Sequence, residues 1–153
     1  MPAADVRAGD ELPEFTRRTD LANWNRFAAV NDEFSGQHMD DAGGQRAGFP
    51  TAIGMGYLLW SYLHNVLRDW LGNHGRIVQA SCQFRAPNLR GQTVSARAVV
   101  VRVTDGDDGR RIELDMRVET DESVVLCRGS AVVALADVVR PVPPRSARRA
   151  WCE

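Results

Sequence analysis

The feature that most constrains this chain is a helical stretch, residues 53–71, that is apolar on nearly every side. At helical spacing Ile53, Trp60 and Leu67 fall on one face, and apolar side chains also occupy most other positions. Such a helix must be buried, because a helix on a protein surface keeps one polar side. Polar residues interrupt the stretch well before the ~20 apolar residues that a membrane span requires. The sequence therefore predicts a central helix that other elements enclose.

Downstream of this helix the hydrophobic period changes from helical to twofold, which is typical of β-strands. Four β-rich runs separated by turn residues cover 77–84, 93–103, 111–119 and 124–135. Because the turns are short, we predict that these runs form an antiparallel meander in chain order.

Smaller elements are predicted upstream of the central helix. We expect a strand at 14–18, a helix at 21–30 capped at 19–20, and a loop at 31–41. Another short helix starting at 40–41 is weakened by Gly43 and Gly44, at about 1 kcal/mol each relative to alanine.

An antiparallel sheet curled around one long apolar helix satisfies these patterns and defines an α+β fold. At 153 residues the chain is one domain, which we assign to residues 1–137. Residues 138–153 are rich in Pro and Arg and are expected to be disordered. Because one sheet covers only one side of a helix, we expect a homodimer or a dimer of dimers, with sheets that continue edge to edge.

Charge and residue usage argue against several classes of function. The formal net charge of −1 gives no reason to expect nucleic acid or a membrane as a partner. All 19 basic residues are Arg, which excludes lysine Schiff-base chemistry and the lysine of a P-loop. Cys82, Cys127 and Cys152 form no CxxC pair, so no metal site is predicted. With no signal segment at its start, the chain is expected to be cytoplasmic with free thiols.

The densest group of reactive side chains lies just before the central helix and includes Asp32, Glu33 and His38. Histidine titrates near neutral pH, and a neighbouring carboxylate can share proton transfer with it. An acid and a histidine ahead of a helix N-terminus therefore suggest general acid–base catalysis beside a site for negative charge. The alternative is an exposed histidine in a solvated acidic loop.

Two motifs in this order resemble the MaoC-like dehydratase, or (R)-specific enoyl-CoA hydratase, branch of the hotdog fold. The first runs from Glu33 to His38 and then through 49–55, where that family has D-x-N-P-x-H, a Phe-Gly/Pro element and A-H-G-M. The second, FRAPNLRG at 84–91, is similar to the family's F-R-x-P…G. Here Ser35 and Gly36 stand at the family's Asn and Pro, and Ile53 stands at its second His. The resemblance covers residues 7–136.

This resemblance implies a hotdog enzyme that adds water across the C2–C3 bond of an enoyl thioester, or removes it, in fatty acid or polyketide metabolism. It implies Glu33, or Asp32 in its place, as the residue that activates water. His38 would be the partner that donates to C2 or orients the water. No cofactor is expected beyond the CoA or carrier-protein phosphopantetheine that belongs to the substrate.

The start of the central helix suits the third requirement of this reaction, which is a donor to the enolate oxygen. We expect the N–H of Gly54 to be that donor, with Gly56 also allowing the thioester carbonyl to approach closely. The alternative is that both glycines only permit tight helix–sheet packing.

Four further residues are predicted to bind the substrate: Met55, Tyr57, Arg85 and Asn88. Met55 and Tyr57 are candidates for lining an acyl pocket, with core packing as the alternative. Arg85, like Arg90, suits the phosphates of a CoA or carrier arm, because the guanidinium matches phosphate geometry.

Other functions remain open on the sequence alone. Thioesterases of this fold usually carry a carboxylate on the central helix, where this chain has only Asp69 near the far end. A double-bond isomerase or epimerase would need the same acid–His pair without a retained water. A non-catalytic acyl-binding protein would fit the missing Asn, Pro and second His.

Overall fold

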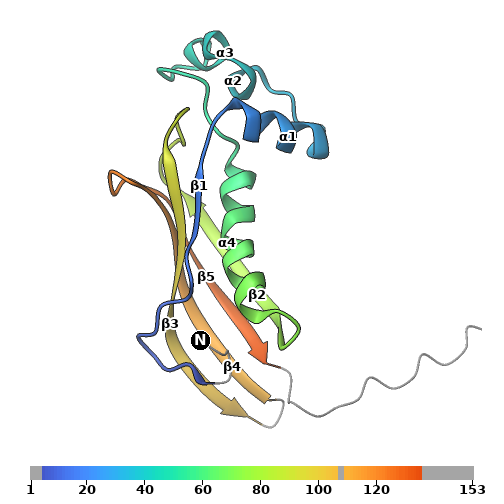
Figure 1. Cartoon of the computed structure of the whole chain (residues 1–153), viewed down its shortest axis with the longest axis vertical. Helices are drawn as coiled ribbons and strands as arrows, with labels where there is room; N and C mark the ends of the chain where they lie inside the picture. The colour runs from blue at the N-terminus through green and yellow to red at the C-terminus, as the bar shows by residue number, and fades with distance from the viewer. Residues whose placement is uncertain (1–4, 107–108, 136–153) are drawn as a thin grey trace, which may run out of the picture.

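One long helix, α4, packs against one face of a five-stranded antiparallel sheet (Figure 1). The computed structural model describes residues 5–106 and 109–135. In chain order its elements are β1 (Phe15–Arg18), α1 (Leu21–Asn31), α2 (Gly36–Met39), α3 (Asp41–Arg46), α4 (Gly56–Leu71), β2 (Gly75–Phe84), β3 (Thr93–Gly106), β4 (Gly109–Thr120) and β5 (Val125–Leu135). The predicted α+β architecture of a sheet around a central helix is confirmed.

The core lies between α4 and the sheet, where both elements present apolar side chains. Buried helix residues are Leu58, Leu59, Tyr62, Leu63, Val66, Leu67, Trp70 and Leu71. Alternate residues of the strands meet them, and the buried ones on β4 are Ile112, Leu114, Met116 and Val118. Each large apolar side chain contributes about 1.5–3 kcal/mol when fully buried, so this contact holds the helix on the sheet. The side of α4 away from the sheet stays open, and Tyr57 there is 67% exposed.

The strand order is β1-β3-β4-β5-β2, which corrects the meander predicted from the sequence. Only β3, β4 and β5 follow one another as antiparallel neighbours, whereas β2 pairs with β5 at the edge of the sheet. The connection between β2 and β3 crosses the end of the sheet, because its backbone bonds to three separate segments. Arg85 N donates to Leu126 O at 2.7 Å, Gly91 N donates to Thr19 O at 2.9 Å, and Asn88 O accepts from the segment before α4.

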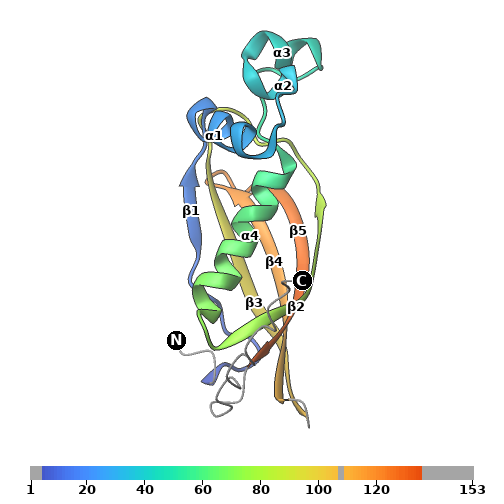
Figure 2. The ribbon, with the colours of Figure 1, turned by 90° about the vertical axis from the view of Figure 1, so that its right-hand side faces the viewer.

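Helices α1, α2 and α3 cluster at the end of the molecule where α4 begins (Figure 2). The α1 helix starts as predicted, because Asp20 accepts from the backbone N–H of Leu21 and the Asn23 side chain accepts from the backbone N–H of Asp20. Trp24 and Ala28 attach α1 to the core, since both are fully buried. The three small helices therefore form a cap over the N-terminus of α4.

Two boundaries differ from the sequence predictions. Residues 36–39, predicted as loop, form the short helix α2, and α4 begins at Gly56 rather than near residue 53. Ile53 instead forms an isolated β-bridge with Leu89, and Ile53 N donates to Gln37 O at 3.0 Å. The backbone around Ile53 is thus hydrogen-bonded to segments on both sides, so it cannot form the hydrogen bonds of a helix.

The glycines that were expected to weaken α3 are required by close backbone contacts. A Cβ on Gly43 would lie 2.0 Å from Gly36 O, and one on Gly44 would lie 2.0 Å from Thr51 O. No side chain fits these positions, so packing outweighs the low helix propensity of glycine.

None of the described helices is long and apolar enough to cross a membrane. The predicted disordered tail at 138–153 and the domain boundary at 137 lie outside the described residues.

Candidate active site

A cavity of about 490 Å³ opens beside the N-terminus of α4. The residues that line it come from the α1–α2 connection, α2, the segment before α4, the first turn of α4, and the end of β2 with the loop that follows. They include Glu33, Gln37, His38, Phe49, Ile53, Gly54, Gly56, Tyr57, Leu59, Phe84, Arg85 and Asn88. Mostly apolar walls with a few converging polar groups are the usual features of a small-molecule site.

His38 is held in one orientation by the backbone of the segment before α4. Its side chain is 7% exposed, and Nδ1 lies 2.8 Å from the carbonyl oxygen of Ile53. A carbonyl only accepts hydrogen bonds, so Nδ1 carries the proton and donates it. In the neutral ring Nε2 is therefore the unprotonated nitrogen, with a lone pair available to a reacting proton. The structure thus gives a buried histidine in place of the exposed one considered as the alternative.

Glu33 is the carboxylate that the fold brings to this nitrogen. Its Oε1 lies 3.8 Å from His38 Nε2, which is too long for a direct hydrogen bond. A water oxygen placed about 2.8 Å from both atoms would make an Oε1–water–Nε2 angle of about 85°. This angle is close enough to the angle between the two O–H bonds of water for one hydrogen bond to be donated to each atom. The gap between the two side chains therefore has the dimensions of a shared water site.

Asp32 does not take part in this arrangement. It is exposed and ends α1 with a left-handed backbone, φ 54°, and it does not line the cavity. Of the two acids that the sequence left as alternatives, the structure places Glu33 beside His38.

Gln37 is a neighbour of His38 that the sequence reasoning missed. Its Nε2 lies 3.3 Å from His38 Nε2, so the amide donates to the lone pair of the neutral ring. Its position directly before the histidine is the only signal in the sequence, and a helix turn was needed to bring the two side chains together. Gln37 also accepts from Ile53 N through its backbone oxygen.

The predicted role of Gly54 as oxyanion donor is not supported by the geometry. Its N–H donates to the carbonyl oxygen of Asn88 at 2.8 Å and is already paired. A Cβ at this position would lie 2.9 Å from both Asn88 Oδ1 and Trp24 Nε1, so the glycine permits close packing. The packing alternative raised for Gly54 is the one that the structure supports.

Unpaired backbone donors occur two and three residues later, where α4 begins. Met55 is the N-cap and makes no side-chain hydrogen bond to the helix. Within the described residues no acceptor bonds to the N–H of Gly56 or Tyr57, as expected in the first turn of a helix. The Phe84 ring covers Gly56, because a Cβ there would lie 2.9 Å from the ring. These two N–H groups are the donors that face the cavity wall.

The predicted substrate-binding residues are in different environments. Tyr57 and Arg85 are exposed and line the cavity, whereas Met55 is fully buried in the core and does not line it. Asn88 lines the cavity but is buried, and its Nδ2 donates to Gln92 Oε1 at 3.2 Å. Met55 is therefore a packing residue, which corrects its assignment from the sequence.

Arg90, the other phosphate candidate, is engaged elsewhere. Its Nη1 lies 2.7 Å from Asp41 Oδ2, and the second oxygen of Asp41 accepts from Ala52 N at 3.0 Å. This pair joins α3, the β2–β3 loop and the segment before α4, so it braces the backbone that orients His38.

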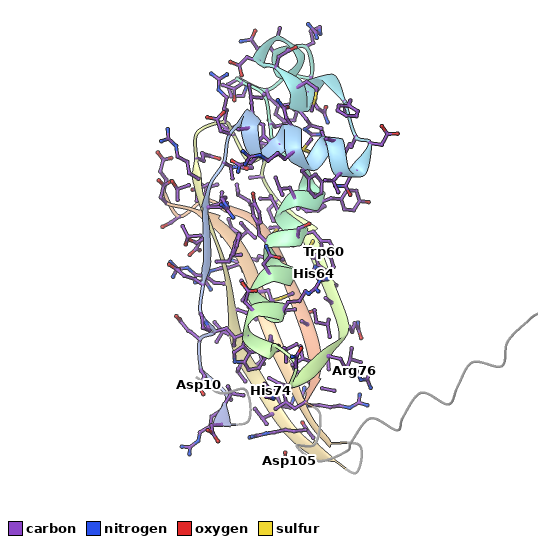
Figure 3. The ribbon with its side chains drawn as sticks, turned by 45° about the vertical axis from the view of Figure 1, so that its right-hand side comes forward. Asp10, Trp60, His64, His74, Arg76 and Asp105 are labelled. Carbon is purple, nitrogen blue, oxygen red and sulfur yellow. The ribbon has the colours of Figure 1, made fainter. Side chains whose placement is uncertain are left out.

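The other two histidines and the two thiols among the described residues, Cys82 and Cys127, do not line the cavity. Figure 3 shows His64 beside Trp60 partway along α4 and His74 toward the opposite end of the molecule. His64 Nδ1 is 3.1 Å from Trp60 O. Burial raises the pKa of Cys127 to about 12 and also raises the pKa of Cys82. Neither thiol is a thiolate nucleophile at neutral pH.

A sheet packed on one long helix, with an acid and a histidine at the start of that helix, defines a hotdog domain of the MaoC-like class. The sequence profile of the MaoC-like domain matches residues 7–123. This match covers more than half of the chain, which therefore belongs to that family. The family predicted from the two sequence motifs is confirmed.

Relatives with the same architecture include hydratases. The (R)-specific enoyl-CoA hydratase of Aeromonas caviae is 28% identical over 136 residues, covering 88% of this chain and 99% of the relative. The solved A. caviae (R)-hydratase involved in PHA biosynthesis has a TM-score of 0.78 and 27% identity, covering 88% of this chain and 100% of its own. An unliganded (R)-hydratase of Pseudomonas aeruginosa has a TM-score of 0.78 at 19% identity, covering 96% of both chains. The predicted hotdog fold is confirmed.

Proposed function

We propose that this protein is an enoyl-thioester hydratase that adds water across the C2–C3 bond of its substrate, or removes it in reverse. The observation that carries the proposal is the Nδ1–H bond of His38 to Ile53, which leaves Nε2 unprotonated 3.8 Å from Glu33. Family membership supports it, as does the A. caviae relative, which is an enoyl-CoA hydratase.

In the proposed reaction, a water displaces the Gln37 amide from His38 Nε2 and bridges this nitrogen and Glu33. The Glu33 carboxylate accepts one of its hydrogens and aligns its oxygen with C3. As that oxygen bonds to C3, the other proton passes to Nε2, and the C2–C3 π electrons move toward the thioester oxygen. The imidazolium then returns the proton to C2, so one H₂O is added and His38 ends neutral. Each positioned proton-transfer group accounts for roughly 10²–10⁴-fold in rate.

The negative charge that develops on the thioester oxygen needs a donor, and we assign this role to the N–H groups of Gly56 and Tyr57. They lie at the positive end of the α4 dipole, and α4 has 16 residues. One well-placed donor stabilises such a transition state by roughly 2.7–4 kcal/mol. For a thioester to reach these groups, the Phe84 ring must turn aside, because it covers Gly56.

The apolar side chains of the cavity provide a surface for the acyl chain. Phe49, Ile53 and Leu59 line it from the segment before α4 and from α4 itself, and Tyr57 borders its open side. We propose that these residues bind the acyl group, with CoA or a carrier protein supplying the thioester.

The open side of α4 supports the predicted homodimer, which remains a proposal. Exposed apolar side chains on this side and on β2 are Tyr57, Val78 and Phe84. In the described sheet β2 is an edge strand, so a second copy can continue the sheet there. The dimer of dimers, the cytoplasmic location and the place in fatty acid or polyketide metabolism stay predictions from the sequence.

The test is hydration of crotonyl-CoA, followed as loss of the conjugated enoyl absorbance. We expect turnover by the wild-type protein and a loss of at least 10²-fold in His38→Ala. His64→Ala is the matched control, because it removes a histidine outside the cavity, and it should keep wild-type activity. No turnover by a protein that still binds the thioester would favour the acyl-binding alternative, and equal loss in both variants would contradict the assignment of His38.

A further inference from the structure

The carbonyl oxygen that accepts from His38 belongs to a peptide group that is hydrogen-bonded at both ends. Ile53 O and Gly54 N lie in one planar peptide unit, so neither atom can turn without the other. The oxygen accepts from His38 Nδ1 at 2.8 Å, and the N–H of the same unit donates to Asn88 O at 2.8 Å. The orientation of the histidine ring therefore depends on the position of the Asn88 carbonyl.

A second peptide group, in the β2–β3 loop, continues this chain of hydrogen bonds. Asn88 O and Leu89 N belong to one planar unit, and Leu89 N donates to Gln92 Oε1 at 2.8 Å. Asn88 Nδ2 donates to the same oxygen at 3.2 Å. The side-chain oxygen of Gln92 thus holds both the peptide group and the side chain of Asn88, and it is the acceptor at the far end of the chain.

The hydrogen bonds of this chain all run in the same direction. In each bond the group nearer His38 donates and the group nearer Gln92 accepts. Hydrogen bonds in series polarise one another, so each one strengthens the next. Ile53, Gly54 and Asn88 are buried, so bulk water does not compete for these bonds. The Ile53 carbonyl is therefore a strengthened acceptor for the proton on Nδ1, which keeps Nε2 of the neutral ring unprotonated.

Gln92 is itself anchored to the start of α1. Its backbone oxygen accepts from the N–H of Thr19 at 2.8 Å and from the hydroxyl of Thr19 at 2.9 Å. Thr19 is fully buried, so this anchor belongs to the core of the domain. Gln92 is not among the described residues that line the cavity. It can therefore affect the reaction only through the residues that it holds.

We propose that Gln92 is a positioning residue, which fixes the Nδ1–H tautomer and the ring orientation of His38 through this chain. The inference rests on the proposed function, because it gives His38 Nε2 the proton transfer of hydration. Without the Gln92 acceptor, Leu89 N–H and Asn88 Nδ2 are left unpaired, and the loop shifts to satisfy them. The Asn88 carbonyl moves with the loop, and the His38 ring loses its fixed acceptor.

The test variant is Gln92→Met, which removes the acceptor and keeps an unbranched side chain of the same length. The tautomer of His38 is measured without substrate, from the nitrogen shifts of its ring in protein labelled with ¹⁵N-histidine, and His38→Ala identifies its signals. We expect the wild-type ring to carry its proton on Nδ1 alone, and the ring in Gln92→Met to show both tautomers. In the crotonyl-CoA assay kcat should fall about tenfold or more, because the base is misplaced, while KM stays within about threefold.

Two further variants separate positioning from stability. Gln92→Glu keeps an oxygen acceptor at the same place, so it should rescue the wild-type tautomer and most of kcat. Thr120→Val is the matched control, because it also removes a side-chain acceptor of a backbone N–H in a turn, where Val124 N donates to Thr120 Oγ1 at 3.1 Å. Gln92→Met and Thr120→Val should both lower the midpoint of urea denaturation. Only Gln92→Met should change the tautomer and kcat.

A single Nδ1–H tautomer in Gln92→Met, an equal change in Thr120→Val, or a mixture of tautomers with unchanged kcat would overturn the proposal. If Gln92→Met does not fold, Gln92→Asn takes its place, since it withdraws the same acceptor by one methylene and should give the same mixture. The tautomer is measured without turnover. A protein whose tautomer depends on Gln92 but that does not hydrate crotonyl-CoA would therefore retain this chain of contacts and lose the proposed function.

Discussion

Replacing Glu33 by Gln tests the division of work between the acid and the histidine. The substitution keeps the size of the side chain but removes the negative charge 3.8 Å from His38 Nε2. A water held between the two groups would lose a charged acceptor, and proton transfer to Nε2 would lose its alignment. We expect kcat to fall roughly 10²–10⁴-fold, which corresponds to about 2.7–5.5 kcal/mol of activation free energy.

Stability should change much less than activity in this variant. The Glu33 side chain is 33% exposed, and a pair of this kind contributes about 0–1 kcal/mol to folding. Rates are measured by the loss of enoyl absorbance of crotonyl-CoA, and stability is measured by urea denaturation.

Asp32→Asn is the matched control for Glu33→Gln, because it makes the same charge change one residue away. Asp32 is exposed with a left-handed backbone, which Asn tolerates. The control should keep kcat within about twofold of wild type. If Glu33→Gln retains more than a tenth of the activity, or if both variants lose activity equally, the assignment of Glu33 is refuted.

Three further predictions concern the frame of the site and the buried thiol. Gly44→Ala should destabilise the fold by about 1–3 kcal/mol or more in urea denaturation, because the added Cβ would lie 2.0 Å from a backbone oxygen. Asp41→Ala should lower both the free energy of unfolding and kcat, because it removes the acceptor of Ala52 N–H before α4 and the partner of Arg90. The control Arg90→Ala should lower the free energy of unfolding by less than about 1 kcal/mol. Equal effects of the two variants would contradict the bracing role of Asp41. The pKa of Cys127 is raised from 9.0 to about 12, so its stability contribution is complete below pH 9 and is lost as pH rises toward 12, by about 1.4 kcal/mol per unit. Urea denaturation across that range should show a shallower pH dependence in Cys127→Val, and an equal slope would contradict this.

The elements with strong local signals were predictable from the sequence. The apolar stretch that became α4 could only be a buried helix, and the alternating runs could only be strands. The start of α1 followed from the capping residues at 19–20. Periodicity and caps are properties of a few neighbouring residues, so they can be read without knowing the fold.

Strand order could not be predicted in the same way. A short connection favours pairing of successive strands, yet β2 pairs with β5 because the loop after Phe84 bonds across the end of the sheet. The pairing of β2 with β5 depends on contacts between segments far apart in the chain, and a local sequence pattern does not predict such contacts. The start of α4 was misplaced for the same reason, because Ile53 is held by Gln37 and Leu89.

The sequence predicted which residue types gather at the candidate site, but it did not predict their geometry. His38 and Glu33 were both identified, but the choice between Glu33 and Asp32 required the end of α1, where the left-handed Asp32 turns the chain. Gly54 was predicted as the oxyanion donor because it is the glycine nearest the motif, whereas its N–H is paired with Asn88 O. Backbone hydrogen bonds between distant loops decide which N–H groups stay free.

The most direct measurement of the central claim is the fate of crotonyl-CoA incubated with the protein in ¹⁸O-labelled water and analysed by mass spectrometry. The account predicts a 3-hydroxybutyryl-CoA that has gained one labelled water, with the label at C3, and no such product from His38→Ala. Release of free CoA with labelled crotonate would show a thioesterase, and a product of unchanged mass with a moved double bond would show an isomerase. Either result, or recovery of unchanged crotonyl-CoA, would contradict the proposed hydration.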